Sequence, residues 1–324
     1  MLKSIILRIC SAIVSLALLL TVGFAAGDPY DVRDPDKCLL NFSVLSDVHV
    51  EGNNYMRYKV FAKSLQNVRR NQSGNDAILF LGDNTMNGQH LENMLFHGTV
   101  HALLRGENVL TVVGNHDIGN GEGDYRKLQN RWYDYTRAFF GRNLTAPYYC
   151  EVIGGCCFIV LGPEAQEFYE MAISEAQFAF LADALAKAAE TGRPAFVFAH
   201  FPTDDAVDPD LQPTDRLTQM LAEYNREHDL FVFVGHTHMP LGNWSFHNYD
   251  GYPETYLPRL THLGGENDNE LTDITGIGLE VEVYENEVLL RGRNFYTGEW
   301  YDEADEGDAP QLCEKTYVLK NPVK

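Results

Sequence analysis

The sequence predicts one α/β domain that extends from about residue 38 to residue 324. Short apolar runs alternate with helix-like segments up to about residue 230, which is typical of domains built from separate layers of strands and helices. The last quarter differs, because its alternating apolar and polar residues predict antiparallel strands. No internal repeat, low-complexity linker or change in composition divides this region, so one domain is the simplest interpretation.

Six apolar runs are short enough for strands and apolar enough to be buried on both faces. They are LLNFSVL (39–45), AILFL (77–81), VLTVV (109–113), CCFIVL (156–161), AFVFA (195–199) and LFVFV (230–234). Helices are expected between these runs, at about 56–72, 89–104, 125–140, 174–190 and 214–227.

Local signals support some of these elements. Ser174, followed three residues later by Gln177, predicts a capping box at the start of the helix at 174–190. The pair Gly154 and Gly155 predicts a tight hairpin turn, and a second hairpin is expected around Glu285. The late hairpin explains why the end of the chain is richer in antiparallel strands.

The first 27 residues have the layout of a secretory signal peptide. Lys3 and Arg8 come before an uncharged stretch that extends to Gly27, and the small residues Ala25 and Ala26 lie just before a polar segment. An uncleaved N-terminal membrane anchor is the alternative, because the uncharged stretch is close to the length that spans a bilayer. Either interpretation predicts an extracytoplasmic protein, secreted or held at the cell surface.

Charge and cysteine content limit the partners. The formal net charge is −21 and no Lys/Arg-rich run occurs, so a nucleic acid is not expected as the natural partner. Of the six cysteines, Cys10 lies in the leader and the others lack zinc-ligand spacing. Export permits disulfides, and a bridge between Cys38 and Cys313 is one pairing that the sequence leaves open.

Residues that can bind metal follow five of the apolar runs. They are Asp47 and His49, then Asp83, then Asn115, His116 and Asp117, then His200, and finally His236 and His238. Ligands of open α/β sheets gather at the carboxyl ends of the strands, so these side chains are expected to share one site. A single histidine at a strand end is more often a hydrogen-bonded loop residue, but five such coincidences favour the shared site.

The spacing of these residues supports metal binding. Residues two apart in extended chain point to the same side, so each of the pairs 47/49 and 236/238 can direct two ligands into one cleft. Glycines at 82, 114 and 235 allow a sharp turn and a close approach of the backbone. Imidazole, carboxylate and amide ligands suit zinc, iron or manganese better than calcium. So many candidate ligands are too many for one tetrahedral ion, and they suit two.

The ordered blocks DVH, GD, GNHD, H and GHTH, between residues 47 and 238, resemble the calcineurin-like metallophosphoesterase superfamily. The resemblance implies a four-layer α/β/β/α sandwich, in which two packed mixed sheets carry helices on their outer faces. It also implies a centre of two metal ions at the strand ends. Met86 stands where purple acid phosphatases carry a metal-binding tyrosine, so the closer resemblance is to the bacterial phosphodiesterase-like branch.

The resemblance implies a role for each site residue. One ion would be held by Asp47, His49, Asp83 and His238, and the second by Asp83, Asn115, His200 and His236. His116 would be the general acid that protonates the leaving oxygen, and Asp117 would orient its ring. A hydroxide that bridges the two ions would attack the phosphorus atom.

The expected function is therefore that of an exported hydrolase of phosphate monoesters or diesters, acting on a small-molecule or lipid-linked substrate with two Mn, Fe or Zn ions. The N-terminal segment offers a route to membrane anchoring. The alternative from another class is a non-catalytic module that binds a phosphorylated surface polymer in the metal cleft. Such a module often lacks a metal ligand or the general acid, and this sequence has the complete set.

Overall fold

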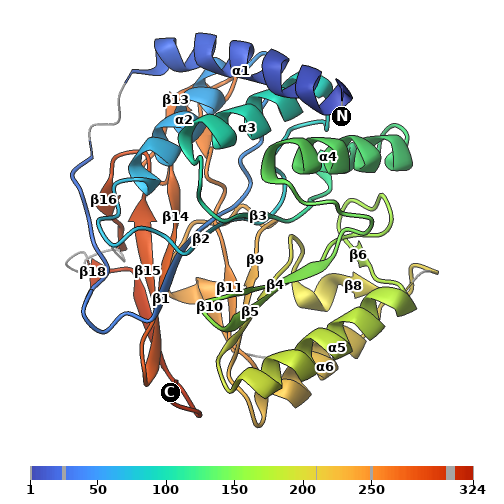
Figure 1. The fold of residues 1–324 in the computed structure, drawn as a ribbon, viewed down its shortest axis with the longest axis vertical. Coiled ribbons are helices and arrows are strands. Elements are labelled where there is room, and N and C mark those ends of the chain that lie inside the picture. The colour runs from blue at the N-terminus through green and yellow to red at the C-terminus, as the bar shows by residue number, and fades with distance from the viewer. Residues whose placement is uncertain (1, 24–26, 209, 249–250, 304–310, 324) are drawn as a thin grey trace.

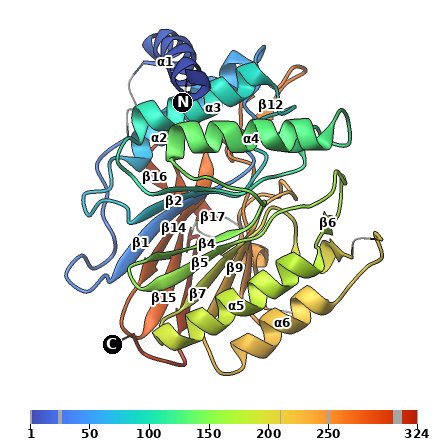
Figure 2. The same cartoon turned by 45° about the vertical axis from the view of Figure 1, so that its right-hand side comes forward.

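The computed structural model describes residues 2–23, 27–208, 210–248, 251–303 and 311–323. Two sheets pack face to face, and helices cover the outer face of each sheet (Figure 1). Turning the molecule shows the same four layers, with α2 to α4 on one side and α5 and α6 on the other, and α1 lies outside the first of these helix layers (Figure 2). The predicted α/β/β/α sandwich is thus confirmed.

The first sheet has seven strands in the order β16-β15-β14-β1-β2-β3, and β19 also pairs with β15. The strands are β1 (Leu40–Leu45), β2 (Ala77–Phe80), β3 (Val109–Thr111), β14 (Ile277–Val283), β15 (Glu287–Asn294), β16 (Glu299–Trp300) and β19 (Glu314–Val318). β1, β2 and β3 run parallel, whereas β14 joins β1 antiparallel. The late hairpin is confirmed, since Val283 pairs with Val288 across its turn.

The second sheet has six strands in the order β10-β11-β9-β7-β5-β4. They are β4 (Tyr149–Ile153), β5 (Cys156–Val160), β7 (Ala195–Phe198), β9 (Leu230–Val234), β10 (Phe246–His247) and β11 (Glu254–Tyr256). β5, β7, β9 and β11 are parallel, with antiparallel strands at both edges. The predicted turn between β4 and β5 is present, and Gly154 and Gly155 both adopt the positive φ that a type I′ turn requires.

Aromatic residues fill the space between the sheets. The ring of Phe42 from β1 lies 5.0 Å from the rings of Phe158 and Phe196, which belong to the opposite sheet. Phe198 and Phe233 extend the same cluster, and all five side chains are buried. Each central strand is therefore covered by the facing sheet on one side and by helices on the other. This double burial is the physical reason why the strands read as continuous apolar runs.

The helices lie where the sequence predicts them, with ends that differ by a few residues. They are α2 (Tyr55–Val68), α3 (His90–Leu103), α4 (Tyr125–Phe140), α5 (Glu175–Thr191) and α6 (Arg216–Asn225). Ser174 caps α5 by accepting a hydrogen bond from the Gln177 backbone. The other half of the predicted capping box is absent, because the Gln177 side chain donates to Gly162 and Glu164 instead. Glu164 accepts the hydrogen bond from the Ser174 backbone in its place.

The N-terminal segment forms helix α1 (Leu2–Val22), which lies on α2 and α3 (Figure 1). Leu18 and Val22 contact the cluster beneath it, whereas Ile13 and Leu20 are exposed on its outer face. Among the described residues, none of the helices combines the length and the hydropathy that crossing a membrane requires. The residues expected to precede signal-peptide cleavage, Ala25 and Ala26, lie outside the described residues.

Shorter elements complete the chain. The paired strands are β6 (Met171–Ala172) with β8 (Ala206–Val207), β12 (Leu263–Gly264) with β13 (Glu270–Leu271), and β17 (Asp302–Glu303) with β18 (Gln311–Leu312). The five cysteines that follow the N-terminal helix are free thiols, so the described structure contains no Cys38 to Cys313 bridge.

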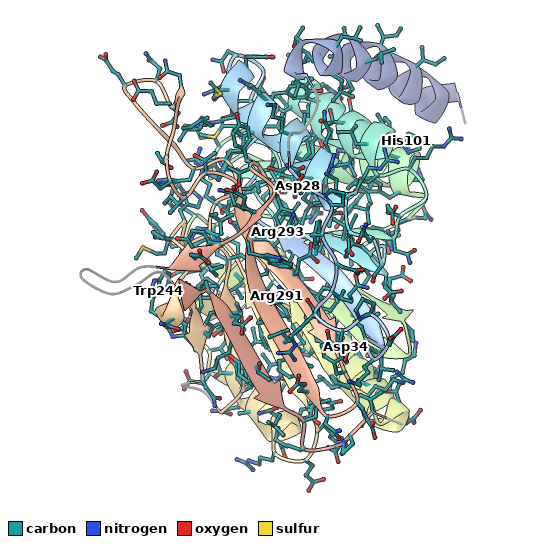
Figure 3. The ribbon with its side chains drawn as sticks, turned by 90° about the vertical axis from the view of Figure 1, so that its left-hand side faces the viewer. Asp28, Asp34, His101, Trp244, Arg291 and Arg293 are labelled. Carbon is teal, nitrogen blue, oxygen red and sulfur yellow. The ribbon has the colours of Figure 1, made fainter. Side chains whose placement is uncertain are left out.

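A buried polar network joins the N-terminal segment to the first sheet. Glu280 of β14 accepts hydrogen bonds from Tyr30 (2.5 Å) and Ser43 (2.9 Å). The Arg293 guanidinium of β15 lies 3.5 Å from the centre of the Tyr30 ring. Figure 3 shows Arg293 on this sheet. Burial raises the pKa of Glu280 to about 7, although Tyr30, Ser43 and Arg293 oppose this shift.

This shift predicts a pH-dependent contribution to stability. Glu280 keeps its proton up to about pH 7 in the folded protein but loses it near pH 4.3 when unfolded, so the free energy of unfolding falls as pH rises between these values. Because Glu280→Gln removes this titration, the stability of the variant relative to wild type should increase with pH, by up to about 1.4 kcal/mol per unit. Urea unfolding at several pH values measures the difference, and parallel curves would contradict the prediction.

Candidate metal centre

The five loops predicted to carry the site meet at one edge of the sandwich. Oδ1 of Asp47 lies 2.9 Å from Nε2 of His238 and 3.6 Å from Nε2 of His49. The two histidine Nε2 atoms are 3.0 Å apart, and Nε2 of His49 lies 3.7 Å from Oδ2 of Asp83. One atom from each of these four residues thus lies within 4.8 Å of the others. The predicted set for the first ion is brought together, although its role as a set of ligands remains a prediction.

The second predicted set surrounds His200. Its Nε2 lies 3.1 Å from Oδ1 of Asn115 and 3.3 Å from Oδ1 of Asp83. The ring of His236 is centred 5.2 Å from that of His200, and the His236 backbone donates a hydrogen bond to Asp47. Asp83 therefore lies between the two sets, with one oxygen near His200 and the other near His49. This is the placement expected of a bridging carboxylate.

The backbone at this edge adopts an uncommon conformation. Asp47, His49, Asp83, His236 and His238 all have positive φ, between 45° and 66°. Residues other than glycine rarely adopt this left-handed region, and such strain concentrates at functional sites. The spacing argument from extended chain therefore applies only in part, because the loops turn at the ligand positions themselves.

Two glycines beside the centre are required by close approach. A β-carbon on Gly114 would lie 2.2 Å from Oδ1 of Asp83, and one on Gly235 would lie 2.1 Å from Oγ of Ser46 and 2.7 Å from Oδ2 of Asp47. Larger residues at these positions would displace the two carboxylates. The two glycines thus permit the close backbone approach that is expected from the sequence.

Electrostatics put the two carboxylates and the rings of His49 and His236 in their metal-binding forms, whereas His200 keeps a proton that a bound ion would have to displace. Burial opposes ionisation of Asp47 and Asp83, but hydrogen bonds and nearby histidine charges hold the pKa of each carboxyl well below its usual range. Burial lowers the pKa of His49 to about 3, and burial together with His200 lowers that of His236 to about 4. Burial also disfavours charge on His200, but Asp83 outweighs it and raises the pKa to about 9. The site thus contains ionised carboxylates that favour a cation between them.

Backbone carbonyls fix the orientation of two rings. Nδ1 of His200 donates to the carbonyl of Leu81 (2.8 Å), so its Nε2 faces Asp83. Nδ1 of His116 donates to the carbonyl of Met86 (2.7 Å), and its Nε2 lies 3.8 Å from Oδ2 of Asp83. Hydrogen bonds of this kind select the tautomer and direct the ligand nitrogen. The donor set and its orientation fit a pair of transition-metal ions.

The structure corrects the role predicted for Asp117. Its carboxylate accepts hydrogen bonds from Asn84, Thr85 and the Gly114 backbone, whereas the His116 ring is held by a carbonyl instead. The two residues occupy one short 3₁₀ turn, where consecutive side chains point in different directions. Asp117 therefore joins the loops that follow β2 and β3 and does not orient His116.

Asn120 is a positioning residue that the sequence did not indicate. Its Oδ1 accepts a hydrogen bond from Nδ2 of Asn115 (2.7 Å), and its backbone donates to the Asn115 carbonyl (2.7 Å). The amide oxygen of Asn115 is thereby turned toward His200. Asn120 has a φ of 53°, which asparagine tolerates better than most residues. The signal in the sequence was only an asparagine in a glycine-rich loop.

Loss of this contact should weaken metal binding at the second set. Asn120→Gly keeps the positive φ but removes the acceptor, so we expect an affinity about tenfold lower for one of two ions. Asn120→Asp keeps an acceptor and is the matched control. Calorimetric titration of metal-free protein with Mn²⁺ measures both steps, and unchanged affinity in the glycine variant would contradict the role.

Comparisons with known proteins agree with this geometry. The model of the calcineurin-like phosphoesterase family matches residues 40–240, which is more than half of the chain. The chain therefore belongs to this family of dimetal-dependent enzymes and is a metal-dependent phosphoric ester hydrolase. A search of curated proteins finds no significant match.

Solved structures share the fold at low sequence identity. A dimetal phosphatase from Danio rerio is 16% identical, with a TM-score of 0.53, and the match covers 80% of this chain and 97% of that one. A purple acid phosphatase from yellow lupin is 14% identical, with a TM-score of 0.53, over 81% of this chain and 52% of that one. At such identities the likeness establishes the fold alone. In this chain Met86 holds His116 through its carbonyl, and its sulfur accepts from Arg57.

Proposed function

We propose that this protein is an exported phosphoesterase that hydrolyses a small-molecule or lipid-linked phosphate monoester or diester at a centre of two Mn, Fe or Zn ions. The observation that carries the proposal is the position of His116. Its partly exposed ring is anchored at Nδ1, and its Nε2 lies 3.8 Å from the same carboxylate, Asp83, that lies between the two ligand sets. A general acid must be beside the reacting phosphoryl group, and this arrangement meets that requirement.

The side chains of the site divide the chemical work. When bound, two ions supply the Lewis acidity that polarises a phosphoryl group and lowers the pKa of water. Asp47, His49, Asp83 and His238 would hold one ion, and Asp83, Asn115, His200 and His236 the other. His116 would hold a proton at Nε2 and deliver it to the leaving oxygen. The Met86 carbonyl keeps the ring oriented during that transfer.

Export is proposed from the N-terminal segment. Lys3 and Arg8 precede an uncharged stretch that extends to Gly27, and the helix at its start exposes Ile13 and Leu20 on its outer face. An exposed apolar face on a segment without acidic residues is consistent with a leader or an anchor. The net charge of −21 also supports a small ester rather than a nucleic acid as substrate.

The test is hydrolysis by protein of known metal content. Full-length protein loaded with Mn²⁺, Fe²⁺ or Zn²⁺ and assayed for two bound equivalents should hydrolyse p-nitrophenyl phosphate, bis-p-nitrophenyl phosphate or both. Relative rates on the two substrates give the monoester or diester preference. If protein with two bound ions hydrolyses neither of them nor an extended panel of cyclic nucleotides and phospholipid head groups, the proposal is wrong, and the non-catalytic binding module replaces it.

A further inference from the structure

The guanidinium of Arg259 is a half-buried cation beside the metal centre, and it has no hydrogen-bond partner among the described residues. Its Nε is buried and unpaired, and its side chain is 16% exposed. Within the described part of the chain, its one ion contact is to Oδ2 of Asp268, at 3.8 Å. A guanidinium has five N–H donors, so this side chain retains most of its binding capacity.

Asp268 does not neutralise the charge of Arg259, because its carboxylate already pairs with Arg57. Nη2 of Arg57 donates to the same Oδ2 atom that Arg259 approaches, and Nη1 of Arg57 donates to Glu51 at 3.1 Å. Arg57 is buried, and its charge is paired with these two carboxylates. Two arginines share one carboxylate oxygen, and Arg259 is the one with the weaker contact.

The backbone holds Arg259 against the loop that carries the first ligands. Leu257 donates a hydrogen bond to Val234, at the end of the strand before His236. Leu260 donates to the carbonyl of Ser46, next to Asp47, at 2.9 Å. Arg259 lies between these two anchors and is therefore fixed beside the centre rather than on a mobile tip.

Arg259 has no direct ion contact with the carboxylates of the centre among the described residues. Burial and Arg57 lower the pKa of Arg259, while Asp268, Asp47 and Asp83 oppose that shift. No ion contact within 4.0 Å joins Arg259 to Asp47 or Asp83 in the described structure. Arg259 thus lies outside the ring of ligands that would surround the scissile phosphoryl group.

The imidazole of His262 is the second polar group at this place. It is half-buried, and its pKa is lowered by burial and by the neighbouring charges of Arg259 and His238. Its backbone carbonyl accepts hydrogen bonds from Thr272 and Thr275, which fix the loop. Arg259 and His262 therefore belong to one turn, in which the His262 backbone donates to the Arg259 carbonyl at 3.2 Å, and Leu260 of this turn is bonded to Ser46 beside the first ligands.

We propose that Arg259, assisted by His262, binds a second anionic group of the substrate, a phosphate or carboxylate carried by the part of the ester beyond the scissile phosphoryl group. This inference rests on the proposed function and narrows its substrate class to esters with two anionic groups. Planar guanidinium groups bind carboxylate and phosphate through paired hydrogen bonds, and burial strengthens such contacts. The two anionic sources share this chemistry, and matched substrates distinguish them.

The first experiment compares hydrolysis of ester pairs by metal-loaded protein. Glycerol 3-phosphate is paired with 3-phosphoglycerate, which adds a carboxylate, and fructose 6-phosphate with fructose 1,6-bisphosphate, which adds a phosphate. Wild type should have a kcat/KM at least about tenfold higher for the second member of one pair, which identifies the preferred anion. Arg259→Met should remove this preference and change the rate on the first member less than about threefold. Equal losses on both members would overturn the inference.

The second experiment measures binding alone and does not depend on catalysis. Titration calorimetry of metal-loaded protein compares phosphonoacetate with methylphosphonate, which lacks the carboxylate and is likewise not hydrolysed, and compares methylenebisphosphonate with the same reference. Wild type should bind one of the two probes that carry a second anionic group at least about tenfold more tightly than methylphosphonate, and Arg259→Met should bind all three alike. Equal affinity of the wild-type protein for all three probes would overturn the inference. This arm gives its result even if no ester is hydrolysed, an outcome that would count against the proposed function instead.

Matched variants exclude a loss of folding as the cause. Arg259→Lys keeps the positive charge but loses the planar guanidinium that makes paired hydrogen bonds, so part of the preference for a second anionic group should remain. Arg33→Met removes an arginine that is paired with Glu287 beside β14 and β15, and it should behave as wild type. If Arg259→Met melts at a lower temperature, the lysine variant still decides the question. The inference is contradicted if Arg259→Lys keeps the full wild-type preference and if His262→Leu binds each probe with the same affinity as wild type.

Discussion

Replacing Asp83 with asparagine should abolish the two-ion centre and lower turnover by about 10³-fold. The variant keeps the shape of the side chain but removes the charge that lies between the two ligand sets, at 3.3 Å from His200 and 3.7 Å from His49. Lewis-acid stabilisation is worth several kcal/mol, and a factor of ten in rate corresponds to about 1.4 kcal/mol. Metal analysis after dialysis, together with hydrolysis of p-nitrophenyl phosphate, measures both effects.

Asp229→Asn is the matched control for this prediction. Asp229 is also a buried carboxylate, but it accepts hydrogen bonds from the backbone of Lys320 and Asn321 near the start of β9, at the end opposite His236. Its substitution should leave metal content unchanged. Retention of two tightly bound ions by Asp83→Asn would refute the bridging position of this carboxylate.

Replacing His116 with alanine should lower kcat by about 10²-fold or more while both ions remain bound. The ring lies 3.8 Å from Asp83, packs edge-on against the His49 ring and is anchored by a backbone carbonyl, so its removal breaks no hydrogen bond to a ligand side chain and should leave the ligand sets in place. The loss should be larger for an alkyl phosphate than for a p-nitrophenyl ester, because nitrophenolate leaves readily without a proton. Steady-state rates on both esters, with metal content measured in parallel, give the comparison.

His101→Ala serves as the control, since this histidine lies on α3 and contacts Phe139 outside the centre. A His116 variant with equal losses on both esters would not have lost a general acid. A variant that keeps both ions and shows no change in any rate would contradict the role of His116 as the general acid.

The sequence predicted the sheet strands because burial on both faces forces continuous apolar runs, and Phe42 and Phe233 show that burial directly. It also predicted that the strand-end residues meet, since parallel strands place their carboxyl ends at one edge. The partner of Asp117 could not be predicted, because the direction of a side chain in a 3₁₀ turn depends on the neighbouring loop.

The roles of residues that lie far from the motifs could not be predicted from the sequence either. Arg259 lies well after His238 in the chain and has no pattern of its own. Its position follows from backbone hydrogen bonds, from Leu260 to Ser46 and from Leu257 to Val234, which no periodicity encodes. Asn120 is similar, because its meaning depends on one contact with Asn115.

The anchoring of the segment around Arg259 has a consequence for how such proteins diverge. The family match ends at residue 240, so the segment that closes one side of the centre belongs to the part of the chain that the match does not cover. Main-chain groups make part of its attachment to the shared part, from Leu260 to Ser46 and from Leu257 to Val234, and the Thr261 hydroxyl adds a hydrogen bond to the carbonyl of Val48. Exchange of residues 257–276 between relatives could therefore transfer substrate preference while leaving the reactive centre intact. This makes the segment a natural unit for grafting.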